Sequence, residues 1–309
     1  MSDETPLGPG AEFDAIRQML ARWGDRAVGI GNDAAVVHVP RGDSLVASVD
    51  AAVEGQHFRR DWLSPREIGY RAVTAAMSDL AATAATPIGA LLALELPASW
   101  LGVLDDLADG IGDAVDAARA HVLGGNVSGG ERLSITTTVL GSAFTVPTRR
   151  GAHAGDRVYV TGTFGAPGAA LDRLLRGEGP GEYREAFARP HARLAESRWL
   201  ADHGVTAAID VSDGLLADLR HLAAASAARV TVDAERVPRV AGVTPAQALS
   251  SGEEYELIVT APFALDGEEF QRQFGIPLTE VGTVGAGPAH VDVRGARVAD
   301  VTGWNHLSR

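Results

Sequence analysis

The chain has 309 residues, of which 46% are hydrophobic and 22% are charged, and its formal net charge is −13. This length allows two domains, because a single hydrophobic core rarely grows beyond about 250 residues. The composition is that of an ordinary globular protein, and the negative charge disfavours nucleic acids and anionic membrane surfaces as partners.

Apolar runs alternate with amphipathic or alanine-rich segments in the N-terminal half, which predicts alternating strands and helices. Residues 1–10 are polar and rich in Gly and Pro, so we expect a loose tail. The predicted helices span residues 12–23, 65–85 and 98–121, and the predicted strands span residues 34–39, 45–49, 88–96 and 133–144. A turn at residues 40–43, Pro-Arg-Gly-Asp, is expected to join the first two strands.

The best candidate for a linker is the segment 146–155, which contains Pro, Gly and two arginines but no apolar periodicity. We therefore expect two domains, residues 1–145 and 146–309. In the second, the predicted strands are 157–161, 206–211 and 255–260 and the predicted helices 168–176, 190–203 and 215–226, followed by short terminal strands. This alternation favours an α/β or α+β fold in which each domain is a mixed sheet covered by helices.

Acidic residues recur at the ends of predicted strands or in the loops that leave them. A single exposed carboxylate is usually a solvated surface residue, so the pattern carries the argument rather than any one member. These carboxylates lie in apolar or Gly/Ser-rich settings without an adjacent basic residue, and magnesium prefers such oxygen ligands together with substrate phosphates. The residues are Asp33, Asp50, Asp79, Asp210, Asp213 and Glu253.

Two residue types are missing from the chain. All 27 basic residues are arginines, so a Walker A lysine, the ATP-anchoring lysine of protein kinases and a Schiff-base lysine are excluded. The chain also has no cysteine, which excludes disulfides, a thiol nucleophile and a zinc–thiolate site. Neither a signal peptide nor a membrane-spanning segment is evident, and we expect a cytoplasmic protein.

Several short motifs have both a functional and a structural interpretation. In IDVSDGLLADL, Ser212 and Asp213 precede a predicted helix, where they could cap the helix or bind phosphate and its counter-ion. The stretch GTFGAPG fits neither common phosphate-binding pattern, and we expect a structural turn without a ligand. Gly124 and Gly125 either permit close approach of a ligand to the backbone or serve only a turn. His57, beside Phe58, is either a substrate-binding or acid–base residue or simply a packed or exposed ring, and alone it is weak evidence for a site.

Taken together, these motifs resemble the thiamine-monophosphate kinase family of the aminoimidazole ribonucleotide synthetase superfamily. The resemblance runs from about Glu12 to His306, with the motifs in the same order and spacing. The most specific segments are GIGNDAAVV at Gly29, VEGQHF at Val53, MSDLAA at Met77, GDRVYVTGTFG at Gly155, IDVSDGL at Ile209 and SGEEYEL at Ser251.

The resemblance implies a homodimeric enzyme that transfers the terminal phosphoryl group of ATP to thiamine monophosphate, with Mg²⁺ as cofactor. It implies an N-terminal domain that supplies most of the Mg²⁺ and nucleotide site and the dimer contact, and a C-terminal domain that completes the active site. The implied Mg²⁺ ligands are Asp33, Ser48, Asp50, Asp79, Asn126, Asp210 and Asp213, of which Asp79, Asp210 and Asp213 are the catalytic group. The implied ATP contacts are Gly125, Asn126, Arg149 and Ser212, and the implied thiamine monophosphate contacts are His57, Glu253 and Trp304.

Four positions depart from the family pattern. The segment GGNVSGG at Gly124 carries Asn126 and Gly129 where the family usually has an aspartate and an arginine. Val49 replaces the usual threonine before Asp50, and Asn32 stands in the usual pair of aspartates. These departures keep open a catalytically weakened nucleotide-binding paralogue.

Another ATP-dependent enzyme of the superfamily is the remaining alternative. Selenophosphate synthetase and the carbamoyl-handling hydrogenase maturation protein depend on cysteine, selenocysteine or lysine residues that this chain lacks. Aminoimidazole ribonucleotide synthetase shares the expected fold, but VEGQHF and SGEEYEL favour the kinase.

Overall fold

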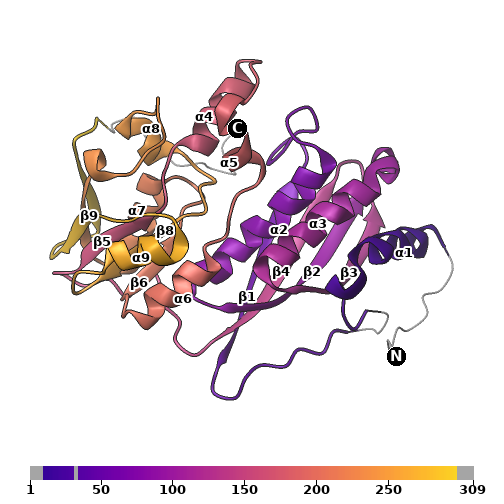
Figure 1. The fold of residues 1–309 in the computed structure, drawn as a ribbon, viewed down its shortest axis with the longest axis horizontal. Coiled ribbons are helices and arrows are strands. Elements are labelled where there is room, and N and C mark those ends of the chain that lie inside the picture. The colour runs from indigo at the N-terminus through magenta and orange to yellow at the C-terminus, as the bar shows by residue number, and fades with distance from the viewer. Residues whose placement is uncertain (1–9, 31–33, 298–309) are drawn as a thin grey trace. The chain divides into compact units, whose positions relative to one another are not determined.

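The computed structural model describes residues 10–30 and 34–297. The chain divides into two compact units, the first made of residues 1–80 and 85–144 and the second of residues 81–84 and 145–309 (Figure 1). Each unit contains one mixed sheet with helices, as the sequence predicts. Among the described residues, no helix combines the length and hydropathy needed to cross a bilayer.

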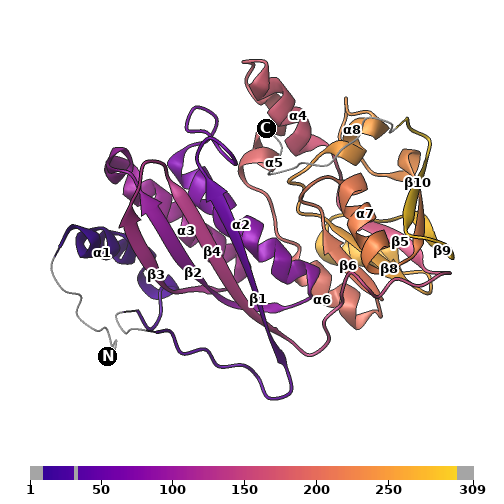
Figure 2. The same cartoon turned by 180° about the vertical axis from the view of Figure 1, so that it is seen from behind.

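The first unit is built on a four-stranded sheet. Its strands are β1 (Ser44–Val53), β2 (Thr86–Leu96), β3 (His121–Gly129) and β4 (Ser134–Ala143), in the order β1-β4-β2-β3. β4 is antiparallel to β1 and β2, whereas β2 and β3 are parallel. Helices α2 (Pro65–Ala82) and α3 (Leu104–Ala118) cover one face, and the view from behind shows the strands in front of them (Figure 2).

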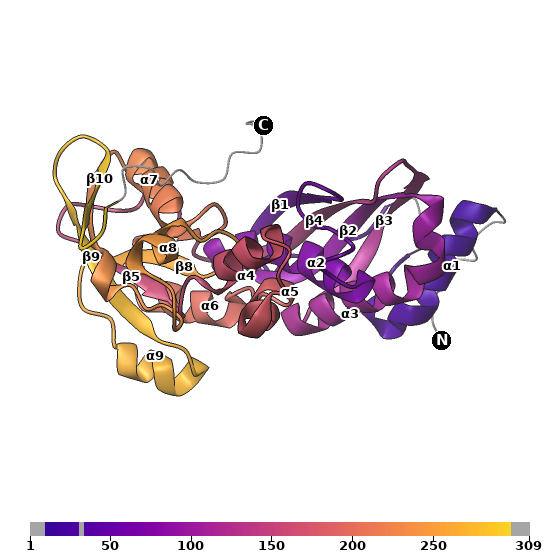
Figure 3. The same ribbon diagram turned by 90° about the horizontal axis from the view of Figure 1, so that it is seen from above.

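The second unit contains a six-stranded sheet in the order β10-β7-β9-β5-β8-β6. Its strands are β5 (Arg157–Thr161), β6 (Ala207–Asp210), β7 (Arg229–Asp233), β8 (Leu257–Ala261), β9 (Leu278–Gly285) and β10 (His290–Arg294). Its helices are α4 (Ala166–Leu175), α5 (Arg184–Ala188), α6 (Leu194–Asp202), α7 (Leu215–Ala225), α8 (Pro245–Ser250) and α9 (Gly267–Phe274). Helices α7 and α9 lie on opposite sides of this sheet (Figure 3).

The first unit also contains α1 (Ala11–Trp23), which packs beside α3. The Trp23 Nε1 group donates a 2.9 Å hydrogen bond to the Ala108 carbonyl oxygen of α3. Short 3₁₀ turns occur in both units: η1 (Gly24–Arg26), η2 (Ala98–Val103), η3 (Gly181–Tyr183) and η4 (Ala234–Arg236).

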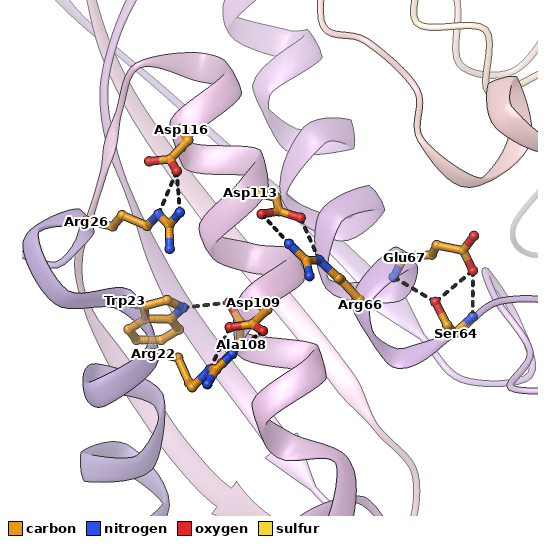
Figure 4. Close-up of polar contacts among 10 residues, drawn as sticks. All are labelled: Arg22, Trp23, Arg26, Ser64, Arg66, Glu67, Ala108, Asp109, Asp113 and Asp116. Carbon is orange, nitrogen blue, oxygen red and sulfur yellow. Dashed lines mark hydrogen bonds and ion pairs between the residues drawn. The ribbon is translucent and has the colours of Figure 1, made fainter.

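Arginines from α1, η1 and α2 pair with a stripe of aspartates on α3 (Figure 4). The aspartates recur every three or four residues, so they share one side of the helix. The pairs are Arg22–Asp109, Arg26–Asp116 and Arg66–Asp113. Arg66 makes two parallel hydrogen bonds to Asp113, of 2.8 and 2.9 Å. Because partly exposed pairs contribute about 0–1 kcal/mol each, they orient the helices more than they stabilise the fold.

A capping box fixes the start of α2. The Glu67 carboxylate accepts hydrogen bonds from the Ser64 backbone N–H at 2.7 Å and from the Ser64 hydroxyl at 2.8 Å. The Ser64 hydroxyl in turn accepts the Glu67 backbone N–H at 3.3 Å. Since Pro65 at the first helical position needs no N–H partner, the sequence Ser-Pro-Arg-Glu specifies this helix start locally.

Glycines let α2 and α3 approach closely. A Cβ atom on Gly110 would lie 1.9 Å from the Arg66 carbonyl oxygen, and one on Gly69 would lie 2.3 Å from the Leu107 carbonyl oxygen. Neither backbone can yield without moving a helix, so both positions require glycine.

Two expected elements differ from the structure. The strand predicted at residues 34–39 is wrong, because this segment pairs with no strand among the described residues and leaves Val36 79% exposed. The helix predicted at 98–121 is instead η2 followed by α3, and residues 121–129 form strand β3 rather than a glycine loop. Pairing with β2 determines β3, and such long-range pairing is not visible in local sequence.

We predict that Gly110→Ala lowers the free energy of unfolding by about 1–3 kcal/mol, because the clash with α2 exceeds the gain in helix propensity. Gly112→Ala on the same helix is the matched control, since the nearest atoms to its Cβ would belong to side chains rather than backbone: Arg26 at 3.2 Å and Trp23 at 3.4 Å. Thermal unfolding of both variants tests this. Equal stability of the two would show that the helices do not approach this closely.

Candidate active site

The two units each carry part of the predicted site, and we describe each part by itself. The first unit contains Ser48, Asp50, His57, Asp79, Gly125 and Asn126. The second contains Arg149, Asp210, Ser212, Asp213 and Glu253. Asp33 and Trp304 lie outside the described residues.

In the first unit, β1 and α2 bring a hydroxyl and a carboxylate together. The Ser48 hydroxyl donates a 2.5 Å hydrogen bond to Asp79 Oδ2. Asp50 lies two residues beyond Ser48 on the same strand, so its side chain leaves β1 on the same face. The Asp50 side chain is exposed, and its Oδ1 accepts the Ala51 backbone N–H at 2.8 Å. These three residues offer oxygen donors of the kind that Mg²⁺ prefers.

Gly125 and Asn126 lie on β3, at the opposite edge of the sheet from β1. Gly125 must be glycine, because a Cβ there would lie 2.0 Å from the Leu92 carbonyl oxygen of β2. Three strand spacings of about 4.8 Å separate β3 from β1, which is about 14 Å. Since Mg²⁺ binds oxygen at about 2.1 Å, Asn126 and Asp50 of one copy cannot hold the same ion.

A tight loop follows β1 and holds His57 in place. The His57 Nδ1 atom accepts the Val53 backbone N–H at 3.1 Å, so the tautomer with the proton on Nε2 fits this contact. Glu54 supports the loop, because its Oε2 atom accepts hydrogen bonds from Trp100 Nε1 at 3.0 Å and from the Leu133 backbone N–H at 3.3 Å. His57 is half-buried, and Phe58 beside it is packed in the core.

In the second unit, the turn between β6 and α7 carries Asp210, Ser212 and Asp213. Asp210 is the last residue of β6 and is only 4% exposed. Asp218, on the first turn of α7, accepts the backbone N–H groups of both Ser212 and Asp213 at 3.1 Å through its Oδ2 atom. The Asp218 carboxylate thereby fixes the turn that carries the predicted ligands.

The carboxylates of this turn crowd one another. Burial, together with the nearby charges of Asp210 and Asp213, raises the pKa of Asp218 to about 7. The side chains of Asp213, Asp218 and His221 each place a potential ligand atom within 4.8 Å of the others. A divalent cation would offset both the burial of the Asp218 charge and its repulsion by Asp210 and Asp213, so the residues present fit a bound cation.

Backbone hydrogen bonds join this turn to the loop that precedes β8. The Glu253 N–H donates to the Ser212 carbonyl at 2.7 Å, and the Tyr255 N–H donates to the Val211 carbonyl at 2.9 Å. Glu253 and Tyr255 adopt positive φ angles of 57° and 52°. Each such conformation costs a non-glycine residue about 1–3 kcal/mol, so the surrounding structure must hold the loop in place.

Two buried glutamates anchor this loop on either side of Tyr255. Glu254 Oε1 accepts the Gly165 backbone N–H at 2.6 Å. Glu256 accepts Arg193 Nε at 2.8 Å and the Thr161 hydroxyl at 2.6 Å. Burial raises the pKa of Glu254 to about 8, although the hydrogen bonds from Ser251 and the Gly165 N–H act to lower it.

The stretch GTFGAPG leads into α4. Two of its backbone N–H groups already donate hydrogen bonds to side chains from the loop before β8. Glu254 accepts the Gly165 N–H, and the Ser251 hydroxyl accepts the Gly168 N–H at 3.0 Å. A phosphate would have to displace both side chains. The contacts agree with the expectation of a structural turn.

Arg149 lies between the first unit's last strand and β5, and its side chain is exposed. Its carbonyl oxygen accepts the Ser226 hydroxyl at 2.7 Å, which ties this segment to the end of α7. The local structure therefore fixes the Arg149 backbone and leaves the guanidinium at the surface.

Sequence reasoning missed Asp218, Glu254 and Glu256. A signal for Asp218 was present, because it is a lone carboxylate inside the apolar helix segment Leu-Leu-Ala-Asp-Leu. The two glutamates flank Tyr255 in SGEEYEL, but local sequence does not show which carboxylates of that segment are buried. Their partners, Gly165 and Arg193, lie far away along the chain.

Comparisons with known proteins agree with this fold. The AIR synthase related protein N-terminal domain matches residues 31–143, and the corresponding C-terminal domain matches residues 153–293. The thiamine-monophosphate kinase of Escherichia coli K12 is 34% identical over 295 residues, covering 89% of this chain and 88% of that protein.

Solved structures give the same result. The thiamine-monophosphate kinase from Stenotrophomonas maltophilia K279a superposes with a TM-score of 0.82 at 31% identity, covering 92% of this chain and 97% of that one. The structure of AaThiL complexed with AMPPCP and TMP has a TM-score of 0.77 at 29% identity, covering 99% and 100%. The chain therefore belongs to the AIR synthase related proteins and, within them, to the thiamine-monophosphate kinase family, and the resemblance inferred from its motifs is confirmed.

We predict that Glu254→Gln gains stability over the wild type as pH rises. The folded-state pKa of Glu254, about 8, exceeds its ordinary value, so the stability that its proton contributes is present below about pH 4 and is lost as pH rises through 8. Glutamine keeps an acceptor for Gly165 and does not titrate. The stability difference should therefore shift by roughly 1–4 kcal/mol in favour of the variant between about pH 5 and pH 9.

Thermal unfolding across this pH range, without divalent cations, measures the effect. Glu268→Gln is the matched surface control, since its side chain is 92% exposed. A pH-independent difference between Glu254→Gln and the wild type would contradict the assignment.

Proposed function

We propose that this protein transfers the terminal phosphoryl group of ATP to thiamine monophosphate and so forms thiamine diphosphate and ADP. The observation that carries the proposal is the extended similarity of the chain to thiamine-monophosphate kinases, together with the absence of lysine from its sequence. The structure of AaThiL in complex with AMPPCP and TMP supports both substrates. The acceptor is already an anionic phosphate, so the reaction needs positioning and charge neutralisation more than a general base.

Magnesium is the proposed cofactor. Bound Mg²⁺ would neutralise charge on the phosphates and on the transition state. The proposed ligands are Asp33, Ser48, Asp50, Asp79, Asn126, Asp210 and Asp213. The Ser48–Asp79 hydrogen bond and the raised pKa of Asp218 support acidic oxygen clusters that a cation would stabilise.

Backbone and arginine groups are the proposed ATP contacts. Gly125 offers a strand backbone without a side chain, and Arg149 offers an exposed guanidinium. Ser212 lies in the turn before α7, where the backbone N–H groups of Ser212 and Asp213 are held by Asp218. These contacts fix the backbone of Ser212, and its exposed hydroxyl is the proposed donor to a phosphate oxygen.

The proposed thiamine monophosphate contacts are His57, Glu253 and Trp304. His57 is oriented by the Val53 N–H, which its Nδ1 atom accepts. Glu253 is carried on the strained loop, and its carboxylate is suited to a cationic ring. Trp304 would pack an aromatic face on such a ring.

We also propose that the protein is a homodimer and that its N-terminal domain, residues 1–145, supplies the contact. The face of β1 that points away from α2 and α3 carries Leu45, Ala47, Val49 and Ala51, all exposed in the single chain. Asp50 and Asn126 lie on the two edge strands of one sheet, too far apart to share an ion. Pairing of the edge strands β1 and β3 with those of a second copy would satisfy their open backbone groups, and packing of the two apolar faces against each other would remove them from water.

The C-terminal domain, residues 146–309, is proposed to complete the active site with Arg149, Asp210, Ser212, Asp213 and Glu253. Since ATP is the proposed co-substrate, we place the protein in the cytoplasm.

A catalytically weakened nucleotide-binding paralogue is the second candidate function. Asn126 favours it, because a neutral amide occupies the position of an expected anionic ligand. Binding of ATP without turnover would separate this candidate from the kinase.

We predict that purified protein with ATP and Mg²⁺ converts thiamine monophosphate to thiamine diphosphate and that Asp79→Asn lowers turnover by about 100-fold or more. The amide removes a charge but keeps an acceptor for the Ser48 hydroxyl, so the fold should remain intact. Coupled ADP release and chromatography of the product measure the activity. Asp172→Asn, at an exposed carboxylate of α4, is the matched control. No product from the wild type would refute the kinase, and full activity of Asp79→Asn would remove Asp79 from the site.

We predict that Asn126→Asp lowers the Mg²⁺ concentration needed for half-maximal activity or raises turnover. A carboxylate binds Mg²⁺ more tightly than an amide oxygen, and each 1.36 kcal/mol of transition-state stabilisation is about tenfold in rate. Initial rates across a Mg²⁺ titration test this, with Asn126→Ser as a neutral comparison. A variant that folds normally but shows neither gain would leave a changed substrate or a non-catalytic role as the better account.

A further inference from the structure

A threonine hydroxyl in the first unit is buried without a partner. The Thr137 side chain, on β4, is 0% exposed, and its Oγ1 atom makes no hydrogen bond within the structure as described. Burying an unsatisfied hydroxyl destabilises a fold, and valine would fill a similar volume without this cost. A threonine at this position is therefore unfavourable unless its hydroxyl has a partner in another state of the protein.

The sheet register places this hydroxyl beside a predicted metal ligand. Thr137 is paired directly with Asp50 on β1. Side chains of directly paired residues lie on the same face, with Cβ atoms about 4.5–5.5 Å apart. Two residues earlier on β1, Ser48 reaches Asp79 of α2, so this is the face that α2 covers. Thr137 and Asp50 thus lie on the face that also carries the Ser48–Asp79 pair.

We propose that Thr137 is a positioning residue for Asp50, a role that rests on the proposed Mg²⁺-dependent function. The Thr137 hydroxyl donates a hydrogen bond to the Asp50 carboxylate when that carboxylate turns to bind a divalent cation. Without the cation, Asp50 Oδ1 accepts the Ala51 N–H, and the Thr137 hydroxyl has no partner. The arrangement parallels Ser48 and Asp79, where a hydroxyl already holds a carboxylate at 2.5 Å.

If Thr137 positions Asp50, removal of its hydroxyl should weaken Mg²⁺ binding but stabilise the metal-free fold. Carboxylates that bind a metal are themselves held by hydrogen bonds, and loss of such a partner typically weakens metal binding by about 10–100-fold. Removal of an unsatisfied buried hydroxyl raises stability when the metal is absent. A residue with only a packing role would not combine a stability gain with a loss of metal affinity.

The test compares Thr137→Val and Thr137→Ser with the wild type in the full-length protein. Thermal unfolding in excess chelator should show a higher melting temperature for Thr137→Val. Calorimetric titration with Mg²⁺ in the presence of a non-hydrolysable ATP analogue should show affinity about 10–100-fold weaker for Thr137→Val and near the wild-type value for Thr137→Ser. Ser197→Ala is the matched control, because Ser197 of the second unit also has a buried hydroxyl without a partner.

The outcomes separate this proposal from the proposed function. Wild-type Mg²⁺ affinity in Thr137→Val would overturn the positioning role and leave the kinase in place. A lower melting temperature of Thr137→Val in chelator would also overturn it, because the hydroxyl would then have a partner in the metal-free fold. Absence of Mg²⁺ binding by the wild type would overturn both. A loss of Mg²⁺ affinity in Ser197→Ala equal to that in Thr137→Val would show that the effect is not local to Asp50.

Discussion

Burial of carboxylates close to one another is the constraint on which the candidate site depends. Asp210, Asp213 and Asp218 gather around one turn, and burial with this crowding raises the pKa of Asp218 to about 7. The chain has no lysine to neutralise such groups. A protein can maintain such a cluster if protons or cations compensate its charge, and Mg²⁺ is the cation that we propose.

The positions of the candidate ligands depend on groups that do not themselves meet a substrate. Asp218 holds the Ser212–Asp213 turn through two backbone N–H groups. Glu254 and Glu256 hold the loop in which Glu253 adopts a left-handed conformation. Buried carboxylates and strained backbone both reduce stability, so their presence here indicates that the site is maintained at the expense of the fold.

Much of the fold followed from local sequence, and the reasons for the exceptions are physical. The amphipathic segment 12–23 and the alanine-rich segment 65–85 are local signals, and helices α1 and α2 lie there. Strand β3 was missed because its glycines disfavour strands on their own, and only pairing with β2 explains them. The strand predicted at residues 34–39 is the opposite case. Its residues favour a strand, but they pair with no other strand among the described residues.

The same distinction applies to the site. The resemblance to the family implied Ser48 and Asp79 as ligands, and a hydrogen bond joins them in the structure. Sequence reasoning did not identify Asp218, which accepts backbone N–H groups of the preceding turn. It also did not identify Glu254, whose partner Gly165 lies far away along the chain. Nor could it show that Asp50 and Asn126 lie on opposite edges of one sheet, which is the basis for proposing a second copy in the complete site.

The central claim is that carboxylates bind the nucleotide through divalent cations in a chain without lysine. Calorimetric titration of the full-length protein with ATP, in Mg²⁺ and separately in excess chelator, tests this claim most directly. The account predicts binding in Mg²⁺ and no measurable binding in chelator. Equal ATP affinity under the two conditions would contradict it.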